Sequence, residues 1–138
     1  LRFTTLYGPG KSGGSTGICS MLIEKSALGQ PVEVNAADAV TDWLYIKDAV
    51  RSLLLAREVD SPKERIYNIG AGTYSVREVA TMVGKVIPDA SIRLESERFF
   101  PWPPSYDWSK AHDELGYVPL FGIAEGIKDF IDEVKKRR

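Results

Sequence analysis

The sequence predicts a protein of the α/β class, in which short strands alternate with about five helices. Two observations favour this class. Short apolar runs alternate along the chain with longer segments whose apolar residues recur at helical spacing. The apolar content of 43% and the charged content of 27% are ordinary for a folded globular protein. With 138 residues and no internal repeat, residues 1–138 are expected to form one domain without an internal boundary.

The first half of the chain predicts three strands and two helices. Residues 1–7 form an apolar run that would need cover on both faces, as a central parallel strand does. Residues 8–17 contain five glycines and predict a flexible loop. A helix with Ile18, Met21, Leu22 and Lys25 on one face should end at Gly29. Strands are expected at 32–34 and 43–46, and Asp48 is the predicted N-cap of a helix that carries Val50, Leu53, Leu54 and Ala56.

The second half continues the alternation. A strand is expected at 65–69, followed by a glycine turn at 70–72. Ser75 and Glu78 have the spacing of a capping box, so a helix should run from there to Pro88. Residues 92–94 predict a strand, and 99–108 predict an irregular segment with three prolines and five aromatic residues. A short helix at 109–115 and a last helix over 123–134 complete the chain.

The composition excludes several classes of protein. Eighteen basic and nineteen acidic residues give a net charge of −1, which argues against a nucleic-acid partner. A single cysteine and a single histidine exclude an internal disulfide and a structural zinc site. No apolar run approaches the roughly 20 residues of a membrane span, and no signal peptide is visible, so a cytoplasmic setting without membrane contact is expected. The basic residues 135–138 are interpreted as a solvated helix end.

Two short motifs suggest nucleotide chemistry but fit it poorly. Gly8, Gly10 and Gly13 have the spacing of the dinucleotide fingerprint Gly-x-Gly-x-x-Gly. In that fingerprint a helix begins at once and its first amides meet the pyrophosphate, whereas here Gly14 and Gly17 follow. A loop is therefore the favoured interpretation, and nucleotide binding by residues 8–13 stays a weaker hypothesis. His112 is interpreted as a surface residue and Cys19 as a small buried one, because neither has a recognisable catalytic partner.

Five segments in a fixed order carry a family resemblance. They are residues 1–9 (LRFTTLYGP), 42–50 (DWLYIKDAV), 67–76 (YNIGAG followed by SV), 107–119 (DWSKA followed by ELGYVP) and 124–127 (AEGI). Together they resemble the NAD-dependent epimerase/dehydratase family of extended short-chain dehydrogenases, a Rossmann-type fold. The resemblance covers nearly the whole chain and concerns architecture more than substrate.

The resemblance implies which part of the family fold this chain supplies. In the family, a first domain carries a Gly-x-x-Gly-x-x-Gly loop and a catalytic Tyr-x-x-x-Lys pair. The loop is not found in this sequence, and no Tyr-x-x-x-Lys spacing serves the catalytic role here. The chain is therefore expected to be the C-terminal, substrate-binding portion of a nucleotide-sugar epimerase, dehydratase or reductase, with no catalytic residues and no metal. NAD or NADP would bind the full-length parent and not this chain alone. The expected partners are a nucleotide sugar and the missing N-terminal domain or a second copy.

The resemblance also nominates site residues on the first strands. Phe3 would approach the nicotinamide end of the cofactor. Thr5 stands where relatives often have a diphosphate-binding asparagine, and Thr41 stands where they often have an arginine. Losing that guanidinium would remove a charge-assisted contact worth about 1.5–3 kcal/mol. These two departures weaken the expected diphosphate clamp.

Three further residues are nominated in the proline-rich segment, and Asn68 has a structural interpretation. Arg98 falls where the resemblance implies a second clamping arginine. Trp102 and Tyr106 would stack on a base or a sugar, or else pack as a lid. Asn68 is expected to stabilise the turn before Gly70.

Two functional hypotheses of different kinds therefore stand. The first is the substrate-binding portion of an NAD(P)-dependent nucleotide-sugar enzyme. The alternative is a non-enzymatic truncated module that oligomerises, or that binds a partner through an uncovered sheet face.

Overall fold

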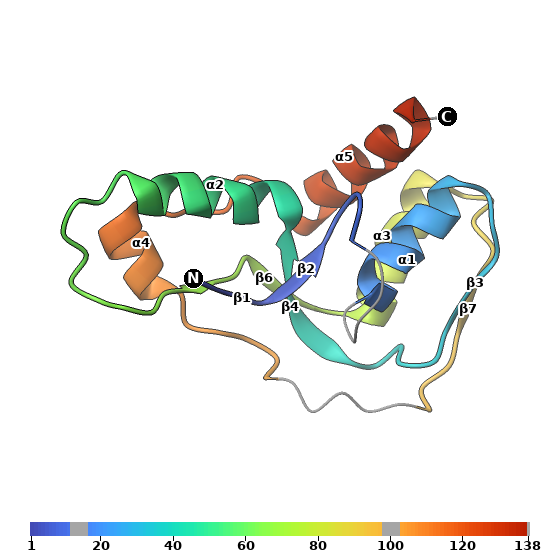
Figure 1. The fold of residues 1–138 in the computed structure, drawn as a ribbon. Helices are drawn as coiled ribbons and strands as arrows, with labels where there is room; N and C mark the ends of the chain where they lie inside the picture. The colour runs from blue at the N-terminus through green and yellow to red at the C-terminus, as the bar shows by residue number, and fades with distance from the viewer. Residues whose placement is uncertain (12–16, 98–102, 138) are drawn as a thin grey trace.

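The computed structural model describes residues 1–11, 17–97 and 103–137, and they form a mixed α/β fold that confirms the predicted class (Figure 1). The helices are α1 (Gly17–Ala27), α2 (Ile46–Arg57), α3 (Val76–Val86), α4 (Ser109–Leu115) and α5 (Ile123–Lys136). The strands are β1 (Arg2–Phe3), β2 (Thr5–Tyr7), β3 (Val32–Val34), β4 (Val40–Tyr45), β5 (Asn68–Ile69), β6 (Gly72–Ser75) and β7 (Ile92–Leu94). Among the described helices, none is long and apolar enough to span a bilayer.

The strands form three small sheets instead of one. β1 pairs with β5 in parallel, and β3 pairs with β7 in parallel. β4 lies between β2, its parallel neighbour, and β6, its antiparallel neighbour. The single strand predicted over residues 1–7 is therefore wrong in one respect: it divides at Thr4, where the chain leaves the β5 ladder and joins the β4 ladder.

Strand β4 separates two apolar clusters, because successive side chains of a strand point to opposite faces. Trp43 and Tyr45 belong to a first cluster with α1, α3 and α5, whereas Leu44 belongs to a second cluster with α2, α4 and β5. Figure 1 shows the same division, with α1, α3 and α5 on one side of β4 and α2 with α4 on the other. Both faces of the first strands are thereby covered, as their apolar sequence predicted.

The predicted N-cap of α2 is wrong. The N-cap residue is Tyr45, and Asp48 lies inside the first turn with no exposed surface. Its carboxylate accepts hydrogen bonds from the backbone N–H groups of Leu120 at 2.9 Å and Phe121 at 3.0 Å. Asp48 thus ties α2 to the segment before α5, because a buried carboxylate needs donors and this segment supplies two.

Other predicted boundaries are confirmed or shifted for identifiable reasons. Ser75 and Glu78 form the predicted capping box at the start of α3. Gly29 follows α1 with a φ of +68°, as expected at a helix end. β4 begins at Val40, ahead of the predicted start at residue 43, because β6 pairs with residues 40–43. β6 was not predicted as a strand, since only Gly72 was expected in a turn and Ser75 at a helix start. Of the strand predicted over 65–69, only residues 68 and 69 form a strand, because they are the two that pair with β1.

The packing of Tyr7 against α5 generates a stability prediction. Gly126→Ala is expected to lower the free energy of unfolding by about 1–3 kcal/mol, because the added methyl group would overlap the Tyr7 hydroxyl and approach the Tyr45 ring. Denaturant unfolding followed by circular dichroism measures the change. Gly84→Ala is the matched control, since Gly84 also lies inside a helix but has no atom within 4 Å of the added carbon. The control should be neutral or stabilising by about 0.5–1 kcal/mol, and equal effects of the two substitutions would contradict this packing argument.

Candidate functional site

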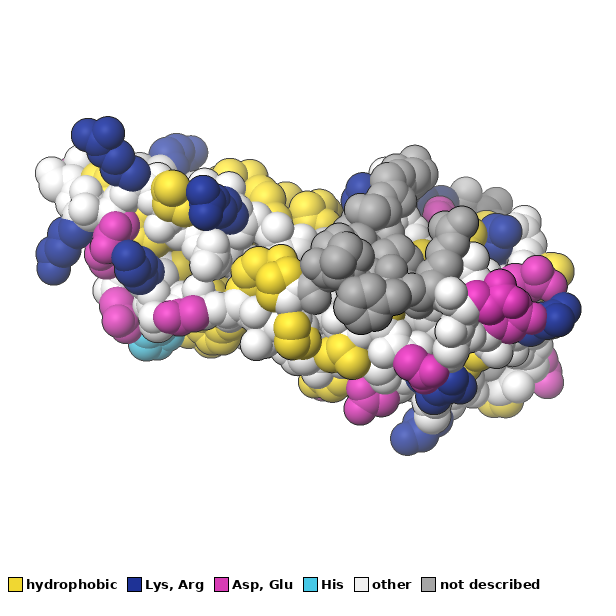
Figure 2. Space-filling model, turned by 90° about the horizontal axis from the view of Figure 1, so that it is seen from below, with side chains coloured by type: hydrophobic (Ala, Val, Ile, Leu, Met, Phe, Trp, Pro, Cys, Tyr) yellow, Lys and Arg dark blue, Asp and Glu magenta, His cyan; other side chains and the backbone are white. Residues whose placement is uncertain are grey.

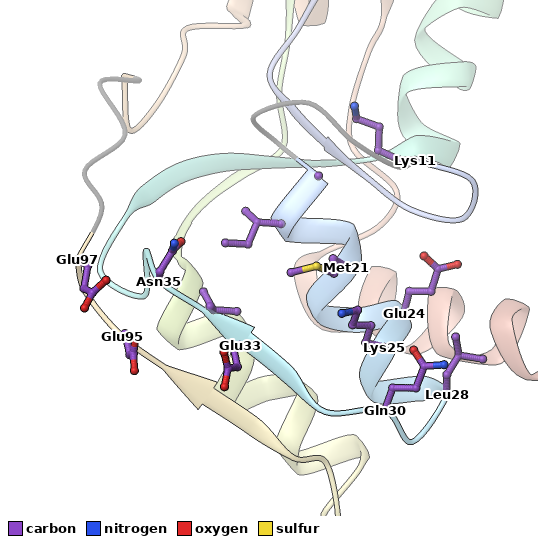
Figure 3. A pocket seen from close by; sticks show the side chains of 13 residues that line it. Lys11, Met21, Glu24, Lys25, Leu28, Gln30, Glu33, Asn35, Glu95 and Glu97 are labelled. Carbon is purple, nitrogen blue, oxygen red and sulfur yellow. The ribbon is translucent and has the colours of Figure 1, made fainter.

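A groove of about 770 Å³ lies between helix α1 and the β3–β7 pair (Figure 3). This volume is in the range of pockets that hold small molecules, about 300–1,000 Å³. The described part of its lining consists of Lys11, Gly17, Ile18, Met21, Glu24, Lys25, Leu28, Gln30, Glu33, Val34, Asn35, Glu95 and Glu97. Figure 3 shows Met21 projecting from α1 toward β3, with Asn35 on the facing wall and Gln30 at the far end.

The groove combines an apolar floor with polar groups at its edges. Ile18 and Met21 come from α1 and pack against the first cluster, to which Val34 of β3 belongs. The side-chain amides of Gln30 and Asn35 each offer both hydrogen-bond donors and an acceptor. Such a lining can pack against the face of a flat ring and form hydrogen bonds with polar groups at the edge of the ring.

The charges of the groove are partly neutralised by an arginine on β7. Arg93 lies 2.7 Å from Glu95 and 3.5 Å from Glu33, so it bridges two carboxylates of the rim. These pairs are more than one-third exposed, so they organise the rim without adding much stability. The remaining lining charges are two carboxylates, on Glu24 and Glu97, and two ammonium groups, on Lys11 and Lys25.

Figure 2 places these charges in a wider view. On the face that it shows, acidic and basic side chains are interspersed toward the two ends, and hydrophobic side chains gather in the middle. Among the described residues on that face, no continuous basic stripe of the kind that follows a phosphate backbone is visible.

The structure brings two of the nominated residues together away from the groove lining. Thr5 of β2 and Thr41 of β4 are 5% and 2% exposed, and their hydroxyl oxygens are 2.7 Å apart. Each hydroxyl therefore has the other as a partner across the β2–β4 ladder. A hydrogen bond between two neutral hydroxyls replaces the cationic contact that the resemblance implied at residue 41.

Next to this pair, the Asp42 side chain forms hydrogen bonds at the point where β1 ends and β2 begins. One of its carboxylate oxygens accepts from the Thr4 hydroxyl and from the Ala71 backbone N–H, both at 2.9 Å. Burial raises the pKa of Asp42, although these two hydrogen bonds act in the opposite direction. A Cβ on Gly70 would lie 2.8 Å from the other carboxylate oxygen, so the close approach of this turn requires glycine.

The other nominated residues lie on different elements. Phe3 of β1 is half-buried and packs against the second cluster. Tyr106 is half-buried on the segment that leads to α4. Asn68 has a structural role, as expected, but with another partner: its side-chain amide donates to the carbonyl of Asp107 at 3.0 Å. Arg98 and Trp102 lie outside the described residues.

The glycine-rich turn does not form a dinucleotide cradle in the described residues. Gly8 has a φ of +143°, and a Cβ there would collide with the Ile46 side chain, so its glycine is explained by packing. Helix α1 is described from Gly17, and Gly10 and Lys11 are not helical. Gly13 lies outside the described residues, and Gly8 and Gly10 show no helix N-terminus that would meet a pyrophosphate.

The remaining titratable candidates are structural. His112 is exposed and its Nδ1 lies 2.8 Å from Asp113, which confirms the predicted surface position. Cys19 is 1% exposed, which confirms that it is buried. Within residues 1–11, 17–97 and 103–137, no three His, Cys, Asp or Glu side chains are grouped as metal ligands.

The groove itself was missed by reasoning from the sequence. Groove-lining residues and core residues lie on the same elements. In the sequence, Ile18 and Met21 therefore look like part of the ordinary apolar stripe of a helix. Only the packing of α1 against β3 shows that this stripe is half covered. A search for polar side chains flanking an apolar helix stripe would have pointed to Gln30 and Asn35.

The comparisons with known proteins agree with this fold. The profile of the NAD dependent epimerase/dehydratase family matches residues 1–70, just over half of the chain. The chain belongs to this family. Among its curated relatives, a dTDP-glucose 4,6-dehydratase of Streptomyces antibioticus is 33% identical over 107 residues, which are 72% of this chain and 30% of that protein.

Two solved structures show the same fold at low identity. An L-threonine dehydrogenase from Cupriavidus necator has a TM-score of 0.84 and 21% identity, over 97% of this chain and 47% of that one. A UDP-glucuronic acid 4-epimerase from Bacillus cereus, solved with UDP-glucuronic acid and NAD, has a TM-score of 0.81 and 24% identity, over 99% and 45%. The chain spans about a third of the length of the curated relatives that it matches and about half of the solved chains.

The raised pKa of Asp42 predicts a pH dependence of stability. The folded state holds a proton on this carboxyl more tightly than the unfolded state does, so Asp42 should make the protein more stable as the pH falls toward about 4. Asp42→Asn keeps an oxygen acceptor for Thr4 and Ala71 but cannot titrate. In urea unfolding between about pH 7 and pH 4, acidification should therefore change the stability of this variant less favourably than that of the wild-type protein. Identical pH profiles would contradict the assignment.

The environment of Cys19 predicts an inert thiol. Burial raises the pKa of this thiol to about 12, and the thiolate is the reactive form. Native protein should react with a thiol reagent at least about a hundredfold more slowly than protein unfolded in guanidinium chloride, in which one thiol should be titrated. Equal rates in the two states would show that Cys19 is accessible.

Proposed function

We propose that this chain forms the substrate-binding portion of an NAD(P)-dependent enzyme of the epimerase/dehydratase family, and that it does not catalyse the reaction alone. The groove between α1 and β3 carries the proposal, because it is a ligand-sized site on a chain that belongs to this family. The cofactor, NAD or NADP, would be held by the part of the family fold that has no counterpart in these residues. This chain would bind and orient the substrate.

The leading substrate class is a nucleotide-linked sugar. Two of the relatives named above are enzymes of such compounds by their names, a dTDP-glucose dehydratase and a UDP-glucuronic acid epimerase. In this proposal a base lies on the apolar floor formed by Ile18 and Met21, and Asn35 reads its polar edge. Arg98, which follows the rim residue Glu97 in the sequence, is the proposed diphosphate contact.

The other nominated residues keep proposed roles outside the described lining of the groove. Trp102 and Tyr106 are proposed to stack on the ligand, and Phe3 is proposed to face the nicotinamide end of the cofactor. Thr5 and Thr41 are proposed second contacts to phosphate, which would require their shared hydrogen bond to open.

A second candidate substrate class is favoured by that hydrogen bond. Thr5 and Thr41 are buried and already paired, and neither supplies a positive charge to a diphosphate. A small polar substrate without a diphosphate would not need one. The fold is shared with an L-threonine dehydrogenase, whose name states such a substrate.

Calorimetric titration distinguishes the two classes. UDP-glucose, UDP-glucuronic acid, dTDP-glucose and L-threonine would each be titrated into the protein. Met21→Glu places a carboxylate in the groove and is expected to weaken binding of a nucleotide sugar at least about tenfold through charge repulsion. Val86→Glu is the matched control, since it makes the same charge change at an exposed position of α3 outside the groove lining and should leave affinity within about twofold.

Each outcome has one meaning. Heat from a nucleotide sugar that Met21→Glu removes and Val86→Glu retains supports the leading proposal. Heat from L-threonine alone replaces it with the second class. Wild-type affinity in both variants would place the ligand outside the groove, and silence from all four compounds would refute both classes. In that last case the alternative is favoured, namely a non-enzymatic module that self-associates. Light scattering tests it directly.

A further inference from the structure

A second pocket lies at the end of the molecule opposite to the groove. It has a volume of about 510 Å³ and forms where the start of β1, the segment before β5 and the start of α4 meet. In Figure 1 the start of β1, near the label N, lies beside α4, whereas α1, β3 and β7 lie at the other end. The described linings of the pocket and of the groove share no residue, so the two cavities are separate.

Basic side chains outnumber acidic ones around this pocket. Its charged lining residues are four cations, Arg2, Lys63, Arg65 and Lys110, and two carboxylates, Glu64 and Asp107. The described lining therefore carries a net charge of +2, although the whole chain carries −1. A concave surface with an excess of one charge concentrates ions of the opposite sign. The pocket is thus expected to attract an anion.

The carboxylates and the lysines of this end of the molecule have partners nearby. Glu64 lies 2.7 Å from Lys110. One oxygen of Asp107 accepts a hydrogen bond at 2.9 Å from the first backbone N–H of α4. Outside the lining, Glu114 accepts from the backbone N–H of Lys63 at 3.0 Å, which places a further carboxylate near that lysine. The two arginines therefore remain as the cations that are available to a ligand.

The guanidinium groups of Arg2 and Arg65 extend from neighbouring points of the chain. Among the described residues, neither of these groups forms an ion pair or a hydrogen bond. The backbone N–H of Arg2 donates to the carbonyl of Tyr67 at 2.8 Å, and Arg2 pairs with Asn68 in the β1–β5 ladder. Arg65 lies two residues before Tyr67. The ladder thus holds the two arginines beside one another at the same pocket.

Two guanidinium groups in one pocket favour phosphate over carboxylate. One guanidinium group already satisfies both oxygens of a carboxylate through two parallel hydrogen bonds. A phosphate monoester has three terminal oxygens and a charge of about −1.5 to −2 at pH 7, so it can accept hydrogen bonds from two such groups. Ile66, which is 48% exposed in the same lining, offers an apolar contact to the carbon part of the ester.

We infer that this pocket binds a phosphate monoester, with Arg2 and Arg65 as its contacts to the phosphate. The inference does not depend on the proposed function, because the pocket is separate from the groove and uses other residues. It gives the protein a second ligand site, on the side of the fold where β1, β5 and α4 begin.

Calorimetric titration with phenyl phosphate, in a phosphate-free buffer of low ionic strength, tests the inference. Benzoate is the matched ligand, because it has the same ring and a carboxylate in place of the phosphate. Arg2→Gln and Arg65→Gln each remove one guanidinium group from an exposed position of the lining. Arg137→Gln is the matched control, since it makes the same charge change at the exposed C-cap of α5, outside the lining of both cavities. Circular dichroism would establish that each variant is folded.

The expected result is that phenyl phosphate binds at least about tenfold more tightly than benzoate. Arg2→Gln and Arg65→Gln should each weaken its binding at least about fivefold, whereas Arg137→Gln should leave it within about twofold. No heat from phenyl phosphate up to about 10 mM would overturn the inference. Equal losses in all three variants would also overturn it, because attraction by the overall charge would then explain binding. Benzoate binding as tight as that of phenyl phosphate would refute the assignment to phosphate.

Met21→Glu separates this result from that of the proposed function. It changes the groove and not the pocket, so phenyl phosphate should bind this variant within about twofold of the wild-type affinity. Loss of phenyl phosphate binding in Met21→Glu, with Arg65→Gln unaffected, would place the ligand in the groove and overturn the inference. Nucleotide sugars that give no heat would refute the leading substrate class and leave the phosphate site in place.

Discussion

The buried carboxylate of Asp42 is the interaction on which the rest of this fold depends. The chain changes ladder partner between Phe3 and Thr5, from β5 to β4, and such a division leaves polar groups facing each other without a strand between them. Asp42 fills that place by accepting from Thr4 on one side and from Ala71 on the other. The arrangement carries a desolvation cost, which appears as a raised pKa. In return it ties β4, the central strand of the β2–β4–β6 sheet, to the ends of the β1–β5 pair.

Local chemistry made part of this fold predictable. The capping box at Ser75 and the helix ends at Gly29 and Gly116 each depend on a few adjacent residues, and the structure confirms them. The failures came from contacts distant in sequence. Asp48 has the residue type of an N-cap, but its donors are 72 and 73 positions away. The division of the first strand depends on where β4 and β5 return, which no pattern within residues 1–7 encodes.

The candidate site shows the same limit. Family resemblance nominates residues by position, and the structure shows that two of them, Thr5 and Thr41, are neighbours that pair across one ladder. It could not show that their hydroxyls bond to each other and are shielded from solvent. The groove residues have the opposite character: Ile18 and Met21 look like core in the sequence, and they border a cavity because β3 covers only part of α1. The shape of this groove therefore depends on partial coverage of a helix more than on any recognisable motif.

The placement of Trp43 and Leu44 on opposite faces of β4 has a consequence for how such a protein diversifies. The groove borders the first cluster, whereas the α2–α4 side is built around the second. Substitutions that change the shape of the groove need to be accommodated only by the first cluster, because β4 separates that cluster from the second one. The lining of the groove can thus change during evolution while the packing of α2 and α4 on the other side of β4 stays as it is.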